Sequence, residues 1–367
     1  MANINNKMDV HNIIHPGFIL GQELKARKLT QKIFANQIAM QQSHLSEIIK
    51  GKRNITEQIA VRLEEALSIP ADIWMKLQAE YDFKQKTERL ANVRDREADV
   101  ELTEYNVIYD MRTIYLYVGI DNESPKEKLD FCHNALMFGT PSVQRRKSEG
   151  LYRRSEKTGL DPRMISTWSV LAKYEASKKP KPETIFSKDN IDELVSELRV
   201  IFNENLNTMN RVERTLYKYG IKFCIVPKLR HASVDGYSFV MDDVPSIVVT
   251  KRFNRIDNIA FAVMHEVGHL AKHSSEDEEG HINLPYYNAE TSIPKEENEA
   301  NEFAADALIP VELWDSLPPV ELNPYTIQKK YTKWAKNNNL NEWIVLGRVS
   351  HETGMYMFKS NPSREIK

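Results

Sequence analysis

One pentapeptide restricts the possible folds of this 367-residue chain more than any other feature. His265 and His269 flank Glu266 in the sequence HEVGH, an H-E-x-x-H pattern. Four residues advance a helix by about 400°, so the two imidazoles lie about 40° apart and can share one tetrahedral metal ion. Apolar residues at helical spacing, including Ile259 and Leu270, predict that this helix is buried. The chain is therefore expected to place a metal-binding helix inside a packed domain.

A catalytic zinc site needs a third protein ligand, and a second helix downstream offers several carboxylates. Glu299 and Asp306 are seven residues apart, so they lie about 20° apart around that helix, with Glu302 beside them. We expect Glu299 to be the third ligand, with Glu302 as the alternative and Asp306 as a partner of a ligand histidine. Two rival ligands remain: His273 would have to lie a further helical turn along, and His281 lies in an expected loop.

The chemistry expected at such a site is hydrolysis of an amide bond. Zinc would polarise the carbonyl and acidify water, and Glu266, about 100° around the helix, would take the proton. Tyr237, Tyr286 and His351 are candidates for stabilising the oxyanion, although the sequence places none of them. The run SIVVTK (246–251) fits either a sheet edge that pairs with an extended substrate or a buried strand. The alternative reading of the two histidines is a structural or inactive site.

Cysteine content and hydropathy exclude several classes of protein. Cys132 and Cys224 are the only cysteines, too few for a disulfide framework or a thiolate zinc site, and are expected to be buried free thiols. The net charge is −2, and 41% hydrophobic residues suffice for ordinary globular cores. No apolar run approaches the roughly 20 residues of a membrane span, and the start lacks signal-peptide order, so we expect a cytoplasmic protein without membrane contact.

The charge is unevenly distributed along the chain. Residues 1–70 contain nine Lys/Arg against six Asp/Glu, whereas residues 272–306 contain two against ten. This asymmetry favours a nucleic-acid-binding end and a separate acidic site, although solvated surface would give the same pattern.

Residues 14–80 show five short amphipathic helical patterns, and residues 30–55 read as helix, short turn and helix, which a helix-turn-helix requires. Ser43 is expected to cap the second of these two helices. Polar side chains at its start can hydrogen-bond base edges, and basic residues after it can contact phosphates. A helical protein-interaction module with a basic face is the alternative. The candidate DNA-binding residues are Gln41, Gln42, Ser43, His44, Lys50, Lys52 and Arg53.

The remaining patterns predict a mainly helical α+β protein with a small sheet. β-Branched and aromatic runs at 221–227, 237–242 and 246–251, bounded by Gly, Pro and Asp, are typical of strands. Helical patterns surround them on both sides. The expected domains are a five-helix helix-turn-helix domain (1–82), a helical connecting region (83–182), and a zincin-like domain with a C-terminal helical extension (183–367).

Two parts of the chain resemble known families. Residues 17–82, from GFILGQ to LQAEYD, resemble the HigA branch of the phage-repressor-like helix-turn-helix family, including the closing W-x-x-L-Q-x-x-Y. The stretches VDGYSFVMDDVPSIVVTKRFNRIDNIAFAVMHEVGHLAKH, ENEANEFAADALIP and NEWIVLGRVSHETG resemble the ImmA/IrrE family of zinc metallopeptidases. One departure is Ile309 before Pro310, where that family often has Met; we expect no consequence for the chemistry.

The resemblance implies a Zn²⁺ site made of His265, His269 and the Glu of Glu299-Ala300-Asn301, with Glu266 as catalytic base. It also implies one of two roles. The first is a DNA-binding regulator with a zinc-dependent endopeptidase domain that cleaves a regulatory protein, either repressor-like or part of a toxin-antitoxin pair. The second is a HigA-like antitoxin and autorepressor whose metallopeptidase fold serves sensing or scaffolding. The expected partners are double-stranded operator DNA and a protein substrate, and paired DNA half-sites favour a homodimer.

Overall fold

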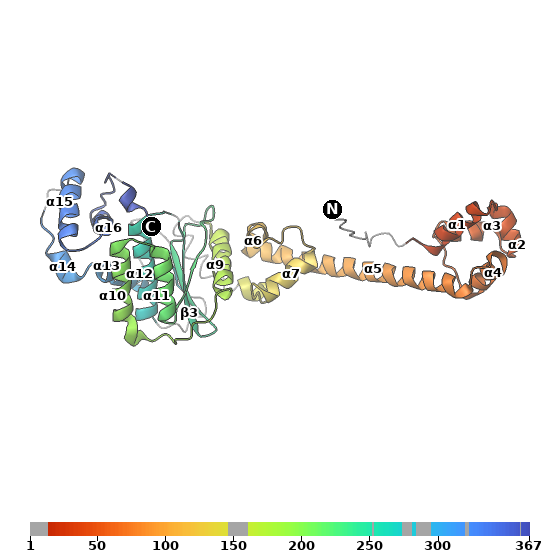
Figure 1. Cartoon of the computed structure of the whole chain (residues 1–367), viewed down its shortest axis with the longest axis horizontal. Helices are drawn as coiled ribbons and strands as arrows, with labels where there is room; N and C mark the ends of the chain where they lie inside the picture. The colour runs from red at the N-terminus through yellow and green to blue at the C-terminus, as the bar shows by residue number, and fades with distance from the viewer. Residues whose placement is uncertain are drawn as a thin grey trace, which may run out of the picture. The chain divides into compact units, whose positions relative to one another are not determined.

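The computed structural model describes residues 14–145, 161–251, 253–273, 281–283, 295–319, 323–359 and 361–367. It forms two compact units, Met1–Ala98 and Asp99–Lys367, where the sequence suggests three segments. The fold is mainly helical with one small sheet, as predicted (Figure 1). Among the described residues, no helix is both long and apolar enough to cross a membrane.

The first unit contains the five predicted helices. They are α1 (Pro16–Ala26), α2 (Gln31–Gln37), α3 (Gln42–Ile49), α4 (Glu57–Leu67) and the first part of α5 (Ala71–Ile108). Their apolar faces meet in one core that includes Leu20, Phe34, Leu45, Leu63 and Trp74. The last helix does not end near residue 82, because neither Gly nor Pro occurs between residues 71 and 108 to interrupt it.

The second unit is built around a four-stranded sheet. Its strands are β1 (Lys222–Ile225), β2 (Gly236–Met241), β3 (Val244–Val249) and β4 (His281–Asn283), in the order β1-β3-β2-β4. Strand β3 runs parallel to β1 and antiparallel to β2. The three predicted runs therefore form strands. The edge position considered for 246–251 is wrong, because β3 has a hydrogen-bonded neighbour on each side and is buried along its whole length.

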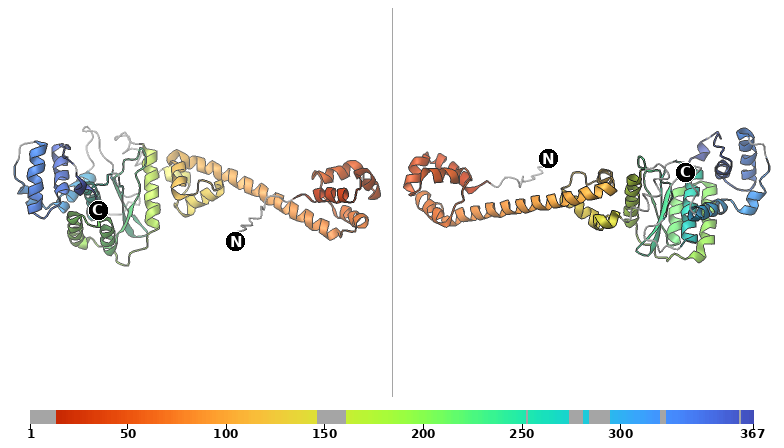
Figure 2. Two further views of the ribbon diagram at one scale, coloured as in Figure 1. Left: turned by 45° about the horizontal axis from the view of Figure 1, so that its top comes forward. Right: turned by 180° about the vertical axis from the view of Figure 1, so that it is seen from behind.

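Helices cover both faces of this sheet. Helix α9 (Pro162–Ser177) packs on one face, where the Trp168 Nε1–H donates to the Pro227 carbonyl at 3.2 Å. The opposite face carries α10 (Ile191–Glu204), α11 (Thr208–Lys218) and α12 (Ile256–Lys272), as both views in Figure 2 show. Part of the region that we expected to connect two domains thus belongs to the sheet layer. Cys132 and Cys224 are buried and free, as predicted.

The remaining helices complete the second unit. Helix α13 (Lys295–Leu308) packs along α12, and a large apolar core joins these helices to the sheet. The C-terminal residues are fixed to this unit by an ion pair of 2.7 Å between Arg364 and Asp257. The other described elements are α6 (Met111–Val118), α7 (Pro125–Asn134), α14 (Val311–Asp315), α15 (Pro324–Asn337), α16 (Glu342–Thr353), and the 3₁₀ turns Lys188–Asn190 and Pro362–Arg364.

Candidate metal centre and helix-turn-helix surface

Small residues bring α12 and α13 into close contact. A Cβ atom added to Gly268 would lie 3.0 Å from Phe303 Cδ1 and 3.3 Å from the Cα of Ala300. These distances leave little room for a larger side chain at Gly268. The glycine within HEVGH therefore lets the second helix approach the histidine-bearing face of the first.

Three side chains converge between these helices. His265 Nε2 lies 3.0 Å from His269 Nε2 and 3.3 Å from Glu297 Oε2, and His269 Nε2 lies 3.7 Å from the same oxygen. Tetrahedral zinc with ligands at about 2.0–2.1 Å places adjacent ligand atoms about 3.3 Å apart. All three residues are buried, and together they form a group that could hold a metal ion. The residues present therefore fit zinc.

The hydrogen bonds and charges of these three side chains are compatible with a bound cation. The Asn301 Oδ1 lies 2.9 Å from His265 Nδ1, so that nitrogen donates and the neutral ring keeps its Nε2 lone pair for the metal. Burial lowers the pKa of His269, which favours the neutral imidazole that binds metals. Burial alone would raise the pKa of Glu297, but contacts with the two histidines outweigh it and lower that pKa to about 2.

Glu297, and not Glu299, is the carboxylate beside the histidines. The Glu299 carboxylate lies 3.3 Å from Lys295 Nζ and 3.9 Å from His273 Nε2, and its side chain is 37% exposed. Two residues correspond to about 200° around a helix, so Glu297 and Glu299 point to opposite sides. The sequence-based choice of Glu299 rested on its position close to Asp306 around the helix. The small residues Ala300 and Ala304, both buried against α12, mark the face that also contains Glu297.

The other candidates are not among the three grouped side chains, although the His273 ring centroid lies 5.4 Å from that of His269. Glu302 accepts a hydrogen bond from Asn298, and Asp306 lies 3.4 Å from Arg348, so Asn301 takes the orienting role expected of Asp306. His273 approaches the carbonyl of Glu296 at 3.2 Å. The side chain of His281 and the whole of Tyr286 lie outside the described residues.

Glu266 points from α12 toward strand β2. Its side chain is completely buried, and a Cβ atom at Gly236 would lie 2.3 Å from its Oε1. Burial raises the pKa of Glu266 well above its usual range; the Ser238 hydroxyl opposes this shift, while the charges of Glu297 and Asp235 add to it. The HEVGH helix therefore carries a buried carboxyl group next to two histidines that could hold a metal ion.

Gly236→Ala is expected to destabilise the protein by about 1–3 kcal/mol, because the new methyl group overlaps the Glu266 carboxylate. Thermal unfolding measures this effect. Gly139→Ala is the matched control, since its Cβ would meet Val143 Cγ1 at an ordinary 3.4 Å. Equal melting temperatures for the two variants would contradict the close contact between Gly236 and Glu266.

A cavity of about 800 Å³ adjoins the cluster. Glu297 and Asn301 form part of its wall. Phe261 also lines it, with ring centroids 6.1 Å from His265 and 6.3 Å from His351. His351, one of the expected oxyanion candidates, thus lines the cavity, whereas Tyr237 is buried in the sheet. The cavity therefore reaches the cluster at Glu297.

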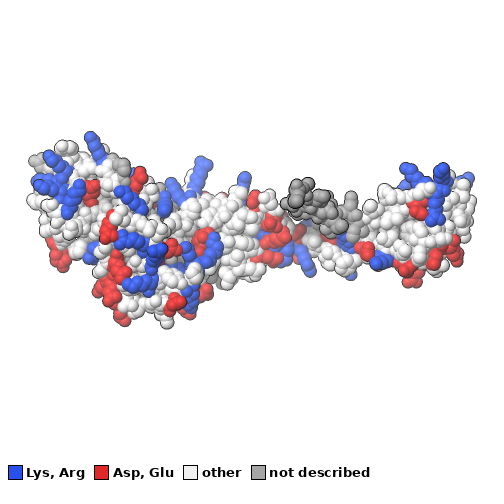
Figure 3. Space-filling view, in the orientation of Figure 1, with Lys and Arg blue, Asp and Glu red and all other residues white. Residues whose placement is uncertain are grey.

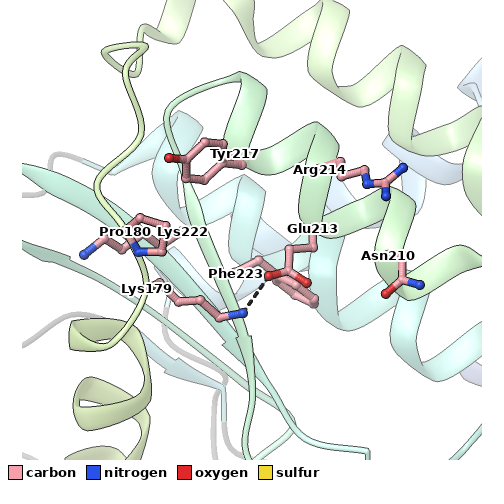
Figure 4. A pocket seen from close by; sticks show the side chains of 8 residues that line it. All are labelled: Lys179, Pro180, Asn210, Glu213, Arg214, Tyr217, Lys222 and Phe223. Atoms are coloured by element: carbon pink, nitrogen blue, oxygen red, sulfur yellow. Dashed lines mark hydrogen bonds and ion pairs between the residues drawn. The ribbon is translucent and has the colours of Figure 1, made fainter.

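A second hollow of about 500 Å³ lies near β1 and α11 (Figure 4). Two lysines in its wall have partners within the protein. Lys179 pairs with Glu213 at 2.6 Å, and Lys222 Nζ donates to the Ala176 carbonyl at 3.3 Å. None of the metal-centre side chains lines it. Of these two cavities, the larger one therefore adjoins the candidate centre.

In the first unit, α2 and α3 form the expected helix-turn-helix. The turn between them contains Ala39 with a φ of 48°, and Arg62 on α4 donates to the carbonyls of Ile38 (3.3 Å) and Ala39 (3.1 Å). A Cβ atom at Gly17 would lie 1.7 Å from the Ile48 carbonyl oxygen, so α1 crosses α3 at close range. These contacts fix the orientation of α3.

The candidate DNA-binding side chains lie at the surface around α3. Gln41, Gln42, Ser43, Lys50, Lys52 and Arg53 are exposed, and His44 is half-buried. Arg53 is 3.3 Å from Glu47. The capping role expected of Ser43 is wrong, because Gln41 precedes α3 and Ser43 already lies in its first turn. On the face drawn in Figure 3, most basic side chains at the right-hand end of the molecule lie at the top and most acidic ones at the bottom.

Comparison with known proteins agrees with this fold. Residues 20–74 match the helix-turn-helix family HTH_3. Two virulence-associated proteins of Dichelobacter nodosus are similar: protein A′ is 33% identical over 79 residues, and protein I is 36% identical over 72. These matches cover 21% and 19% of this chain and 69% and 67% of the relatives. The N-terminal unit is a helix-turn-helix domain, the class that places a helix in the DNA major groove. Through this domain the chain belongs to the HTH_3 family.

Two solved structures are also similar. An addiction module antidote protein of the HigA family from Coxiella burnetii is 30% identical, covers 23% of this chain and 95% of its own, and has a TM-score of 0.22. The Pseudomonas aeruginosa antitoxin HigA with the higBA promoter is 27% identical, covers 22% of this chain and 89% of its own, and also has a TM-score of 0.22. Each covers less than a quarter of this chain.

Proposed function

We propose that this chain is a DNA-binding transcription regulator whose second unit is a zinc-dependent endopeptidase acting on a regulatory protein. One observation carries the peptidase part: the ligand atoms of His265, His269 and Glu297 lie 3.0–3.7 Å from one another, and Glu266, next to His265 in the chain, is buried. The helix-turn-helix domain carries the regulatory part. The substrate class that follows is a repressor or a component of a toxin-antitoxin pair, and the DNA partner is a double-stranded operator.

The residues of the centre have distinct roles in this proposal. His265, His269 and Glu297 would hold the ion, and Asn301 would keep the His265 ring in place. Bound zinc would supply Lewis acidity, which polarises an amide carbonyl and acidifies water. Glu266 would accept a proton on its carboxylate as the water oxygen bonds to the amide carbon. It would then donate that proton to the leaving nitrogen as the C–N bond breaks.

The cavity is large enough to hold part of an extended polypeptide. Its volume of about 800 Å³ falls in the upper part of the usual range for ligand sites. Its wall includes the apolar Phe261 and Ile344 together with charged groups such as Arg348. Such a wall can accept side chains of both kinds from an extended peptide. Comparing protein termini in cells that carry the wild type or Glu266→Gln tests the proposal.

The DNA-binding part has its own expected outcome. Lys52→Ala should weaken binding to every sequence alike and lower the slope of log affinity against log salt by about 1, because a phosphate contact is lost. Gln42→Ala should instead relax sequence preference by about 1–3 kcal/mol at one base pair. Fluorescence anisotropy with operator and scrambled duplexes at several salt concentrations measures both.

Arg62→Lys is not suited as a control for these variants, because Arg62 donates hydrogen bonds to the turn between α2 and α3. Lys76→Ala, in the second turn of α5, removes a cation from the same unit at a distance in sequence from α3. Unchanged binding by Lys52→Ala and Gln42→Ala, with intact helical content, would contradict the placement of α3 on DNA.

A second function is supported by the cavity itself. An antitoxin-like autorepressor could use this space to sense a small ligand, with the metal centre serving stability instead of proteolysis. In that case Glu266→Gln would leave all protein termini unchanged, and a ligand filling the cavity would alter DNA affinity. A small toxin encoded beside this chain would also favour this function.

A further inference from the structure

The middle of helix α5 exposes large apolar side chains. Phe83 is 75% exposed, Leu90 51%, Val93 49% and Val100 64%. Most other side chains between residues 83 and 97 are also exposed, so no described element covers this part of the helix. Exposed apolar residues that form a continuous stripe mark interaction surfaces.

These four residues follow a heptad repeat. The steps from Phe83 to Leu90 and from Val93 to Val100 are seven residues each, and Leu90 and Val93 are three apart. In heptad notation Phe83 and Leu90 occupy position a, and Val93 and Val100 occupy position d. Residues at positions a and d form one seam along a helix. In a coiled coil this seam is buried against a second helix.

Two charged residues occupy the remaining positions of the seam. Lys86 lies at d, between Phe83 and Leu90, and Glu97 lies at a, between Val93 and Val100. Neither forms an ion pair among the described residues. A charge in the seam of a coiled coil determines partner and orientation, because like charges placed together are costly.

We propose that α5 pairs with α5 of a second copy of this chain as a short antiparallel coiled coil. In this register Leu90 packs against Val93 of the second copy, and Phe83 packs against Val100. Lys86 then meets Glu97 of the second copy, and the symmetry of the pair makes this contact twice. A parallel pair would instead bring Lys86 against Lys86 and Glu97 against Glu97. Charge complementarity therefore selects the antiparallel arrangement.

This pairing has a consequence for DNA binding. Helix-turn-helix regulators commonly bind as dimers on paired half-sites. Because α5 begins at the helix-turn-helix core, an antiparallel pair places the two DNA-binding domains at opposite ends of the paired helices. Each dimer would then contact two separated sites and not two adjacent half-sites. This pairing of α5 is independent of the peptidase chemistry.

Sedimentation velocity of the full chain tests the interface. The wild type is expected to dimerise, and Leu90→Asp to raise the dissociation constant at least about tenfold, since it puts a charge in the seam. Asn92→Asp adds the same charge at position c, outside the seam, and should leave the dimer unchanged. A wild type that stays monomeric over the accessible concentration range, or equal effects of the two substitutions, would overturn the proposal.

Charge reversal tests the orientation. Lys86→Glu alone and Glu97→Lys alone should each weaken the dimer, and the double variant should restore it, because the two contacts are re-formed with opposite sign. In a parallel pair each reversal would replace one like-charge contact with another, and the double variant would rescue nothing. Failure of the double variant to restore dimerisation, with helical content intact, would therefore overturn the antiparallel arrangement.

Disulfide crosslinking gives a second measurement. Leu90→Cys mixed with Val93→Cys should crosslink between the two variants, while Leu90→Cys alone should crosslink poorly. The native Cys132 and Cys224 are buried and should contribute little background. Efficient self-crosslinking of Leu90→Cys would show a parallel pair and contradict the proposal.

Discussion

Glu297→Gln is expected to lower zinc affinity by more than about 100-fold, whereas Glu299→Gln leaves zinc bound. Loss of a group that only orients a ligand already costs about 10–100-fold, and Glu297 would be a ligand itself. Its Oε2 lies 3.3 Å from His265 Nε2, while the Glu299 carboxylate faces Lys295. Metal content after dialysis, and competition with a chromophoric chelator, measure the difference.

The pair Glu297→Gln and Glu299→Gln is closely matched, because each replaces one carboxylate by an amide in the first turns of α13. Circular dichroism of both variants excludes unfolding as the cause of lost zinc. Loss of zinc in Glu299→Gln with retention in Glu297→Gln would restore the ligand set that sequence spacing favoured. Equal retention in both would contradict the site.

Glu266→Gln is expected to slow amide hydrolysis by about 10²–10⁴-fold while zinc content stays at the wild-type level, because the amide cannot accept and return a proton. The change is close to isosteric, which matters because Gly236 leaves no spare room around this side chain. Hydrolysis is measured on the purified substrate protein under single-turnover conditions, with zinc determined on the same sample.

Glu302→Gln is the control for this substitution, since Glu302 contacts Asn298 on the same helix and not the metal centre. It should retain activity. A Glu266→Gln variant that binds zinc and cleaves at the wild-type rate would show that Glu266 does not handle the proton. Loss of zinc from that variant would show instead that Glu266 takes part in binding the metal.

Local patterns predicted many elements of the fold, but not strand β4, where a loop was expected at His281. The five N-terminal helices follow from apolar residues at helical spacing and from caps such as Thr30, which accepts from the Ile33 N–H. The three strand runs were predicted from β-branched residues between Gly, Pro and Asp. The helix that carries HEVGH was predicted from its apolar face, and that face is buried as expected.

Features that depend on long-range packing could not be predicted from local sequence patterns. The central position of β3 depends on which strands pair with it, and local patterns do not contain that information. The same is true of α9, whose Trp168 is buried against the sheet although its segment reads as part of a connecting region. The sequence-based choice was Glu299, whereas the structure places Glu297 beside the histidines. The side of α13 that meets α12 is set by Gly268 and Ala300, and spacing between acidic residues does not reveal it.

The length of α5 was missed for a different reason. Its sequence between residues 83 and 100 is rich in charge and looks like an ordinary exposed helix, and the heptad positions become evident only when the whole element is seen as one helix. The exposure of two large apolar side chains, Phe83 and Val100, then favours an interaction seam over an ordinary solvated surface.

Comparison of protein N-termini in cells that carry the wild type, Glu266→Gln or Glu302→Gln is the most direct test of the central claim. We expect at least one new terminus within a regulatory protein in wild-type and Glu302→Gln cells, and its absence with Glu266→Gln. Identical termini in all three strains, with zinc-loaded and folded protein in each, would contradict a peptidase function.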